Sequence, residues 1–186
     1  GGRLSYASLA HEADRFAATL GGRALLLLEM ENHSSAVIAY LGALRARVPI
    51  VLVPPGAQGT ERILTAFAPE LRWCRATGLV EVAAPRGNLH PDLALSLSTS
   101  GTTGTTKLVR LSGRAIDSNA RSIAEYLGLS PGERAITSLP ASYCYGLSVI
   151  NSHLAVGASV VLTEAAVVDD TFWELVDRNG ATSFAG

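Results

Sequence analysis

The sequence is short of several features that point to particular classes of protein. No apolar run approaches the roughly 20 residues that a membrane-spanning helix needs, and the run at residues 24–28 is far shorter. The 15 basic and 16 acidic residues leave a formal net charge of −1, so the chain lacks the excess positive charge that nucleic acid or an anionic membrane attracts. We therefore expect a globular cytoplasmic protein with neither nucleic acid nor a membrane among its partners.

Cysteine and histidine are also scarce. The two cysteines, Cys74 and Cys144, stand far apart in the sequence, and neither has a second cysteine or a histidine at metal-ligand spacing. This pattern favours reduced thiols over a disulfide framework or a zinc site. We expect no metal site formed by these residues.

Lysine is almost missing. Lys107 is the only lysine among the 15 basic residues, and it ends a run of Gly, Ser and Thr. An ammonium is a compact, strongly hydrated point charge, which suits it to uses that arginine does not share. Lys107 is therefore a candidate functional residue.

Helical and strand patterns alternate along the chain. Apolar residues three and four positions apart predict helices at residues 5–20, 36–44, 60–68, 113–127, 147–156 and 171–178. Short apolar runs predict strands at residues 24–28, 49–53, 71–74, 93–98, 108–111, 135–139, 159–162 and near Thr182. Asn32 or Ser34 can cap the second helix. The alternation indicates an α/β fold with mainly parallel β-sheet layers flanked by helices.

A loop rich in hydroxyl groups and glycine follows the strand predicted at residues 93–98. Its residues are Thr99, Ser100, Gly101, Thr102, Thr103 and Gly104. Glycine permits the backbone angles that turn several N–H groups toward one centre, hydroxyls add donors, and Lys107 adds charge. The loop is a candidate phosphate site, although a small-residue surface loop has the same composition. Only two residues separate Gly101 from Gly104 and Leu108 follows the lysine, so the loop is not a P-loop. No helix is predicted directly after the glycines, so it is not a dinucleotide fingerprint either.

The segment STSGTTGTTK, residues 98–107, resembles the signature loop of the adenylate-forming superfamily. That superfamily includes acyl-CoA synthetases, luciferases and the adenylation domains of peptide synthetases, and its usual form is T-S-G-[ST]-T-G-x-P-K-G. The chain departs from it at Thr106 and Leu108, where proline and glycine are usual. Residues 5–20 also resemble the family's opening helix, and residues 138–147 resemble its next motif. Tyr143 takes the aromatic position of that motif, which borders the acyl and thiol-acceptor channel; the alternative is a tyrosine packed at a helix start.

The resemblance implies ATP-dependent activation of a small carboxylic acid to an acyl-adenylate, followed by thioester formation. It implies ATP and Mg²⁺ as cofactors, coenzyme A or carrier-protein phosphopantetheine as acceptor, and a carrier protein as an optional partner. Tyr143 is the expected substrate-binding residue. The expected nucleotide-binding residues are Thr99, Ser100, Gly101, Thr102, Thr103, Gly104 and Lys107.

The family's catalytic lysine, metal-binding glutamate and adenine- and ribose-binding residues are expected beyond Gly186. Residues 1–186 are accordingly expected to form the single, truncated N-terminal portion of an AMP-binding (adenylation) domain, inactive alone. Two other interpretations remain open. One is a non-catalytic nucleotide- or acyl-binding module, in which Thr106 and Leu108 mark a degenerate loop. The other is a purely structural loop in an unrelated α/β domain.

Overall fold

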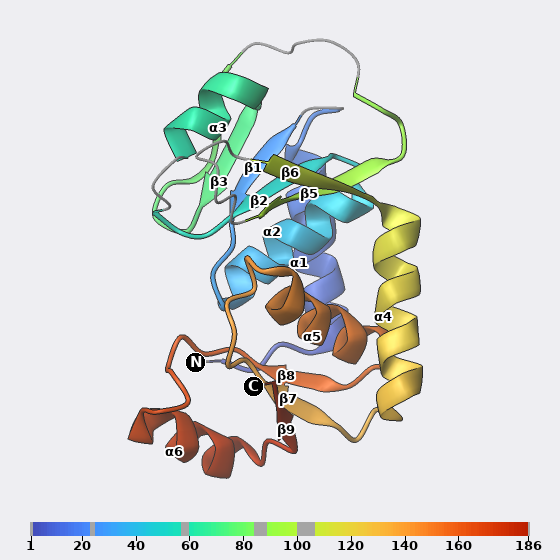
Figure 1. The fold of residues 1–186 in the computed structure, drawn as a ribbon, viewed down its shortest axis with the longest axis vertical. Coiled ribbons are helices and arrows are strands. Elements are labelled where there is room, and N and C mark those ends of the chain that lie inside the picture. Colours follow the sequence, from blue (N-terminus) through green and yellow to red (C-terminus); the bar gives the residue numbers. More distant parts are fainter. Residues whose placement is uncertain (1, 23–24, 57–59, 84–88, 100–106, 186) are drawn as a thin grey trace. The chain divides into compact units, whose positions relative to one another are not determined.

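The computed structural model describes residues 2–22, 25–56, 60–83, 89–99 and 107–185 (Figure 1). The chain forms two compact units: unit 1 comprises Gly1–Met30 and Ser34–Gly113, and unit 2 comprises Glu31–His33 and Arg114–Gly186. Both units combine helices with strands, which confirms the predicted α/β class.

Unit 1 is built around a six-stranded sheet in the order β4-β3-β1-β2-β5-β6. Its strands are β1 (Leu26–Glu29), β2 (Ile50–Val53), β3 (Leu71–Cys74), β4 (Gly78–Glu81), β5 (Leu93–Thr99) and β6 (Lys107–Ser112). The inner strands β3, β1, β2 and β5 run parallel, whereas β4 and β6 pair with their neighbours in antiparallel fashion. The mainly parallel sheet predicted from the sequence is therefore confirmed.

Both faces of the inner strands are covered, which explains why their sequences are apolar throughout. On one face Leu27 and Val53 pack with Ile63 of helix α3, and on the other Leu26 and Leu28 are fully buried. Figure 1 shows α1 and α2 on this second face. The helices of unit 1 are α1 (Tyr6–Thr19), α2 (Ser34–Arg45) and α3 (Thr60–Phe67).

Unit 2 contains a three-stranded parallel sheet in the order β8-β7-β9. Its elements, with the helix that leads into it, are α4 (Gly113–Leu127), β7 (Arg134–Ile136), α5 (Cys144–Ala155), β8 (Ser159–Val161), α6 (Asp170–Asn179) and β9 (Ser183–Phe184). Phe172 of α6 is fully buried, and its ring meets those of Trp173 and Phe184 edge to face. This aromatic cluster joins the last helix to the last strand.

The predicted elements are found within a few residues of their expected positions, with four differences. Strand β7 ends at Ile136 rather than at residue 139. Helix α5 begins at Cys144 rather than at residue 147. Strand β4 was not predicted, because only Leu79 and Val80 supply an apolar signal there. The prediction that Asn32 caps α2 is wrong, since its side chain bonds backbone groups of unit 2 instead. Among the described residues, no helix has both the length and the apolar character that crossing a bilayer requires.

Candidate functional site

The predicted phosphate loop connects two strands that pair side by side. Strands β5 and β6 form an antiparallel ladder whose last pair is Thr99 with Lys107. Opposite residues in such a ladder have Cα atoms about 4.5–5.5 Å apart, so the backbone of the only lysine lies next to the residue that starts the loop. Residues 100–106, which include Ser100, Gly101, Thr102, Thr103 and Gly104, lie outside the described residues, as do the side chains of Thr99 and Lys107.

The predicted phosphate loop follows β5 at the side of the sheet where the parallel strands have their carboxyl ends. The register aligns Glu29 with Val53 and Leu28 with Trp73, so β1, β2 and β3 end level with one another. Strand β5 runs in the same direction beside β2 and ends at Thr99. In open α/β sheets, ligands bind outside the carboxyl ends of the strands. The predicted phosphate loop therefore starts at the edge of unit 1 where such sheets place their sites.

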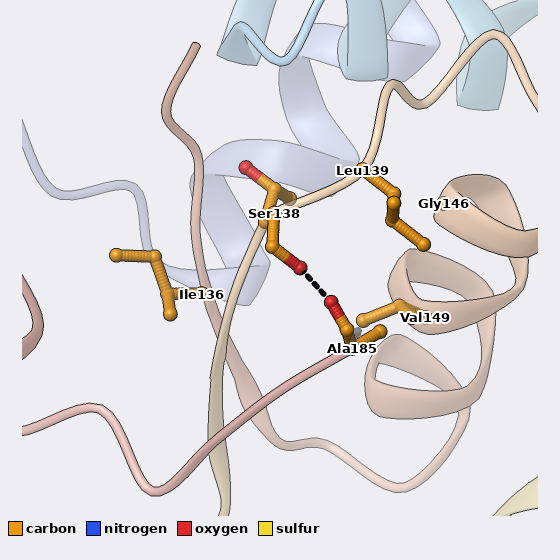
Figure 2. A pocket seen from close by; sticks show the side chains of 7 residues that line it. Ile136, Ser138, Leu139, Gly146, Val149 and Ala185 are labelled. Carbon is orange, nitrogen blue, oxygen red and sulfur yellow. Dashed lines mark hydrogen bonds between the residues drawn. The ribbon is translucent and has the colours of Figure 1, made fainter. Parts of the chain in front are cut away.

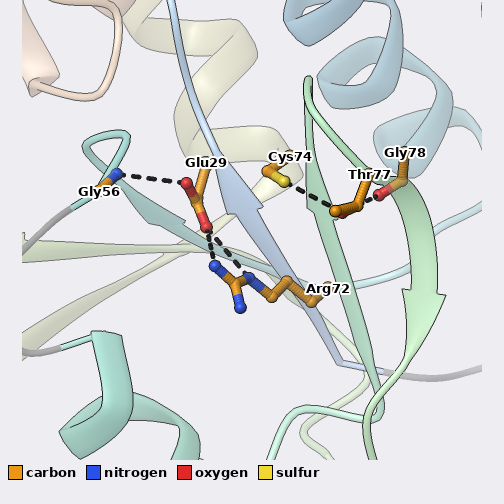
Figure 3. Close-up of polar contacts among 6 residues, drawn as sticks. All are labelled: Glu29, Gly56, Arg72, Cys74, Thr77 and Gly78. Atoms are coloured by element: carbon orange, nitrogen blue, oxygen red, sulfur yellow. Dashed lines mark hydrogen bonds and ion pairs between the residues drawn. The ribbon is translucent and has the colours of Figure 1, made fainter.

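A buried carboxylate lies at the same edge. Glu29, the last residue of β1, is only 6% exposed. Its Oε1 accepts from Arg72 Nη2 at 2.6 Å and from Nε at 3.0 Å, and its Oε2 accepts from the Gly56 amide at 3.2 Å. Figure 3 shows these three residues together. The hydrogen bonds that Arg72 donates to the Glu29 carboxylate raise the pKa of Arg72, against the opposing effect of partial burial. Glu29 thus ties β3 to the turn that follows β2.

Cys74 ends β3 at this edge. Its Sγ lies 3.1 Å from the Thr77 hydroxyl (Figure 3). This hydrogen bond, helped by the backbone amides of Thr77 and Ala76 and opposed by burial, lowers the pKa of the Cys74 thiol below its ordinary value. A larger fraction of thiolate makes a cysteine more nucleophilic near neutral pH.

Tyr143, the predicted substrate-binding residue, lies in unit 2 at the start of α5. Its backbone is extended, with φ −98° and ψ 150°, and its side chain makes no capping hydrogen bond. The side chain is 54% exposed. The place at a helix start fits both interpretations of Tyr143, and its role in substrate binding stays a prediction.

A small indentation of unit 2 lies next to the residues that lead to Tyr143 (Figure 2). In it the Ser138 hydroxyl donates to the carbonyl of Ala185. The open space is about 170 Å³, smaller than the roughly 300–1,000 Å³ of pockets for small ligands. The indentation by itself is too small for a substrate site. It is lined by Ile136, Thr137, Ser138, Leu139, Gly146, Val149 and Ala185.

Sequence reasoning missed one residue of this region, Asn32. Its side chain is buried and holds three backbone groups of unit 2, which belong to Leu139, Ala141 and Thr163. Those partners lie more than a hundred residues further along the chain. Asn32 stands among other polar residues, Glu31, His33 and Ser34, so nothing singled it out in the sequence, and a helix cap explained its presence.

Comparison with known proteins agrees with the resemblance of the loop. The family model described as AMP-binding enzyme matches residues 60–186, more than half of the chain and all of the predicted phosphate loop. A sulfoacetate–CoA ligase of Cupriavidus necator is 35% identical over 104 residues, a stretch that covers 55% of this chain and 20% of the ligase.

Solved structures agree in fold. The chain superposes on apo MbtA of Mycobacterium smegmatis with a TM-score of 0.85 at 24% identity, covering all of this chain and 43% of MbtA. It superposes on apo MatB of Rhodopseudomonas palustris with a TM-score of 0.80 at 24% identity, covering 99% of this chain and 44% of MatB. The chain therefore spans less than half the length of these proteins. Together with the family model, which covers the loop and everything after it, these matches show that the chain belongs to the family of AMP-binding, adenylate-forming enzymes.

Proposed function

We propose that the protein carrying this chain uses ATP to activate a small carboxylic acid as an acyl-adenylate and then transfers the acyl group to a thiol. The match of residues 60–186 to the AMP-binding enzymes is the observation that carries this proposal, because it includes the whole predicted phosphate loop. The similarity to a CoA ligase supports thioester formation and favours coenzyme A over a carrier-protein arm as acceptor. The cytoplasm, where such thiols and ATP are available, is the proposed location.

The first step joins the acid to AMP. A carboxylate oxygen attacks the α-phosphorus of ATP, the bond from that phosphorus to the bridging oxygen breaks, and pyrophosphate leaves. A carboxylate is a weak nucleophile. The protein therefore accelerates this step by holding the carboxylate in line with the bond that breaks and by neutralising the charge that grows on pyrophosphate. In the second step the thiol sulfur attacks the acyl carbon, AMP leaves, and the thiol proton is released.

The loop that joins β5 to β6 supplies the groups that neutralise the negative charge on pyrophosphate. We assign the hydroxyls of Thr99, Ser100, Thr102 and Thr103 and the amides of Gly101 and Gly104 to the β- and γ-phosphates, with Lys107 adding a positive charge. The pairing of Thr99 with Lys107 supports this assignment, because it brings the backbones of the first and last assigned residues side by side. Tyr143 is assigned to the acyl side.

We propose that Mg²⁺ binds together with ATP. Among the described residues no group of three His, Cys, Asp or Glu side chains could hold a metal ion. Mg²⁺ commonly reaches such sites on the substrate phosphates, held by one or two carboxylates. When bound, it neutralises part of the phosphate charge.

Pyrophosphate release by the full-length protein tests the proposal. With ATP, Mg²⁺ and a panel of carboxylic acids that includes sulfoacetate, we expect release that depends on one acid. Lys107→Ala should raise the KM for ATP about 10- to 100-fold, since hydrogen bonds to charged groups contribute about 1.5–3 kcal/mol. Arg110→Ala is the matched control, because Arg110 is an exposed cation on the same strand, β6, and should leave the KM unchanged.

The other outcomes separate the alternatives. ATP binding without acid-dependent release for any acid would indicate a binding module. No ATP binding at all would indicate a structural loop. We also propose that residues 1–186 alone release no pyrophosphate, which the same assay measures on the isolated piece.

A further inference from the structure

Asn32 is a buried asparagine whose side chain has all of its hydrogen-bonding groups occupied. It is 7% exposed. Its Nδ2 donates to the carbonyls of Thr163 at 2.9 Å and Leu139 at 3.2 Å, and its Oδ1 accepts from the Ala141 amide at 2.9 Å. A planar amide offers two donors and one acceptor on a short stem, and here each has a backbone partner.

The position of Asn32 is itself fixed. Its backbone amide donates to Glu164 Oε1 at 2.5 Å, and Glu164 directly follows Thr163, which accepts from the Asn32 side chain. Residues 31–33 belong to unit 2, although the chain before and after them belongs to unit 1. The asparagine is therefore held by the connection that follows β8, and it reaches from there to the connection between β7 and α5.

The segment that Asn32 holds contains the residues leading to Tyr143. Residues 139–143 connect β7 to α5 without forming a helix or strand, so their buried backbone groups need other partners. Asn32 supplies them at Leu139 and Ala141, and Ala141 stands two residues before Tyr143. Tyr143 itself is exposed and has no capping bond of its own.

We propose that Asn32 is a positioning residue that sets the place of Tyr143 by fixing the backbone of Leu139 and Ala141. This inference rests on the proposed function, in which Tyr143 borders the path of the acid and the thiol. The bonds of Asn32 stay within unit 2, whereas the predicted phosphate loop joins two strands of unit 1. Asn32 therefore governs the KM for the acid or the thiol and leaves the KM for ATP unchanged.

Kinetics of the full-length protein give the first test. Asn32→Ala leaves the Ala141 amide buried without a partner and should raise the KM for the acid or the thiol about tenfold, the loss that about 1.4 kcal/mol corresponds to. The KM for ATP should stay within about twofold. If Asn32→Ala does not fold, Asn32→Ser, which keeps a small polar group, carries the same measurement. Unchanged KM values in a folded Asn32 variant would overturn the inference.

Asn179→Ala is the matched control. Asn179 is also an asparagine of unit 2 whose Nδ2 donates to a backbone carbonyl, that of Leu175 at 2.8 Å in α6. Denaturant unfolding of both variants gives the loss of stability in each. A general loss of stability lowers the amount of folded enzyme, and with it the apparent kcat, without changing KM; an equal rise of the KM for the acid in Asn179→Ala would overturn the inference.

A spin label on Cys144 gives a readout that needs no activity. Cys144 is exposed and follows Tyr143 directly; Cys74→Ser removes the other thiol of residues 1–186, and any cysteine elsewhere in the full-length protein is replaced by serine. We expect a mobile spectral component in Asn32→Ala that is missing from the parent and from Asn179→Ala. If that component appears while no variant activates any acid, the proposed function fails and the positioning stands. If acid activation is present and both label mobility and KM are unchanged, the positioning fails alone.

Discussion

Gly146 lies so close to Pro140 that a Cβ on Gly146 would stand 2.3 Å from the Pro140 carbonyl oxygen and 2.9 Å from that of Leu139. The first turn of α5 therefore packs directly against the segment that leads to Tyr143. The backbone of Gly146 is not in the left-handed region, so the requirement for glycine comes from this close approach. Asn32 bonds the same segment at Leu139 and Ala141, so the place of Tyr143 depends on both contacts.

Replacing this glycine should destabilise the protein strongly. Gly146→Ala forces backbone atoms apart, and overpacking of this kind costs about 1–3 kcal/mol or more. The free energy of unfolding of the full-length protein, measured in urea, should fall by that amount. Gly132→Ala is the control, because the added Cβ would meet only the Ser130 Oγ at 3.6 Å at an exposed position. Equal effects of the two substitutions would contradict the steric argument.

The ion pair at the end of β1 provides a second prediction. Glu29 is nearly buried, whereas the Arg72 side chain is 34% exposed. Among the described residues, Arg72→Met leaves the Glu29 carboxylate with only the Gly56 amide, and removing one partner of a buried pair costs about 3–5 kcal/mol. Because Arg72 is partly exposed, we expect the lower end of that range for the loss of unfolding free energy.

A second substitution shows whether the uncompensated charge causes the loss. Glu29→Gln combined with Arg72→Met should be more stable than Arg72→Met alone, since no buried charge is left. Arg121→Met is the control, because the Arg121–Asp117 pair on α4 is exposed on both sides and should contribute little to stability. A double variant less stable than Arg72→Met would refute the explanation.

The sequence predicted what depends on local pattern. The predicted bounds of β3, a short and mainly apolar stretch, agree with the structure. The predicted bounds of α4 also agree, because Gly113 and Gly128 mark the ends of its periodic stretch. Family resemblance also follows from a contiguous motif at residues 98–107, and the match over residues 60–186 confirms it. The role of that loop in binding phosphate stays a prediction, because residues 100–106 lie outside the described residues.

Partners that come together only in the folded chain could not be predicted. In the sequence, Glu29 is explained as the polar end of an apolar strand. Its partner Arg72 lies 43 residues further along the chain. Asn32 is explained as a helix cap. The carbonyl of Thr163 that accepts from its side chain lies 131 residues away. A single sequence carries no local signal for such pairs, since the residue types fit a nearer explanation equally well.

The Ser142 hydroxyl gives a prediction of opposite sign to the others. Ser142 is 5% exposed, and its Oγ has no hydrogen-bond partner among the described residues. A buried polar group without a partner costs about 1–3 kcal/mol, so Ser142→Ala should raise the free energy of unfolding by about 1 kcal/mol. Ser138→Ala, which removes the hydroxyl that donates to Ala185, should lower it. Thermal or urea unfolding of the two variants checks the signs, and a loss in Ser142→Ala would show that the hydroxyl has a partner in solution.

The reactivity of Cys74 should depend on the Thr77 hydroxyl. That hydroxyl lowers the pKa of the thiol, and the thiolate is the form that reacts with iodoacetamide. Alkylation of Cys74 in a Cys144→Ser background should therefore reach its half-maximal rate at a pH below the ordinary cysteine value. Thr77→Val removes the hydrogen bond, raises the pKa, and should move this midpoint to higher pH, with slower alkylation near neutral pH. Thr65→Val, whose hydroxyl bonds the Glu61 carbonyl in α3 instead, should leave the midpoint unchanged; a midpoint that stays in place for Thr77→Val as well would mean that the hydroxyl does not act on the thiolate.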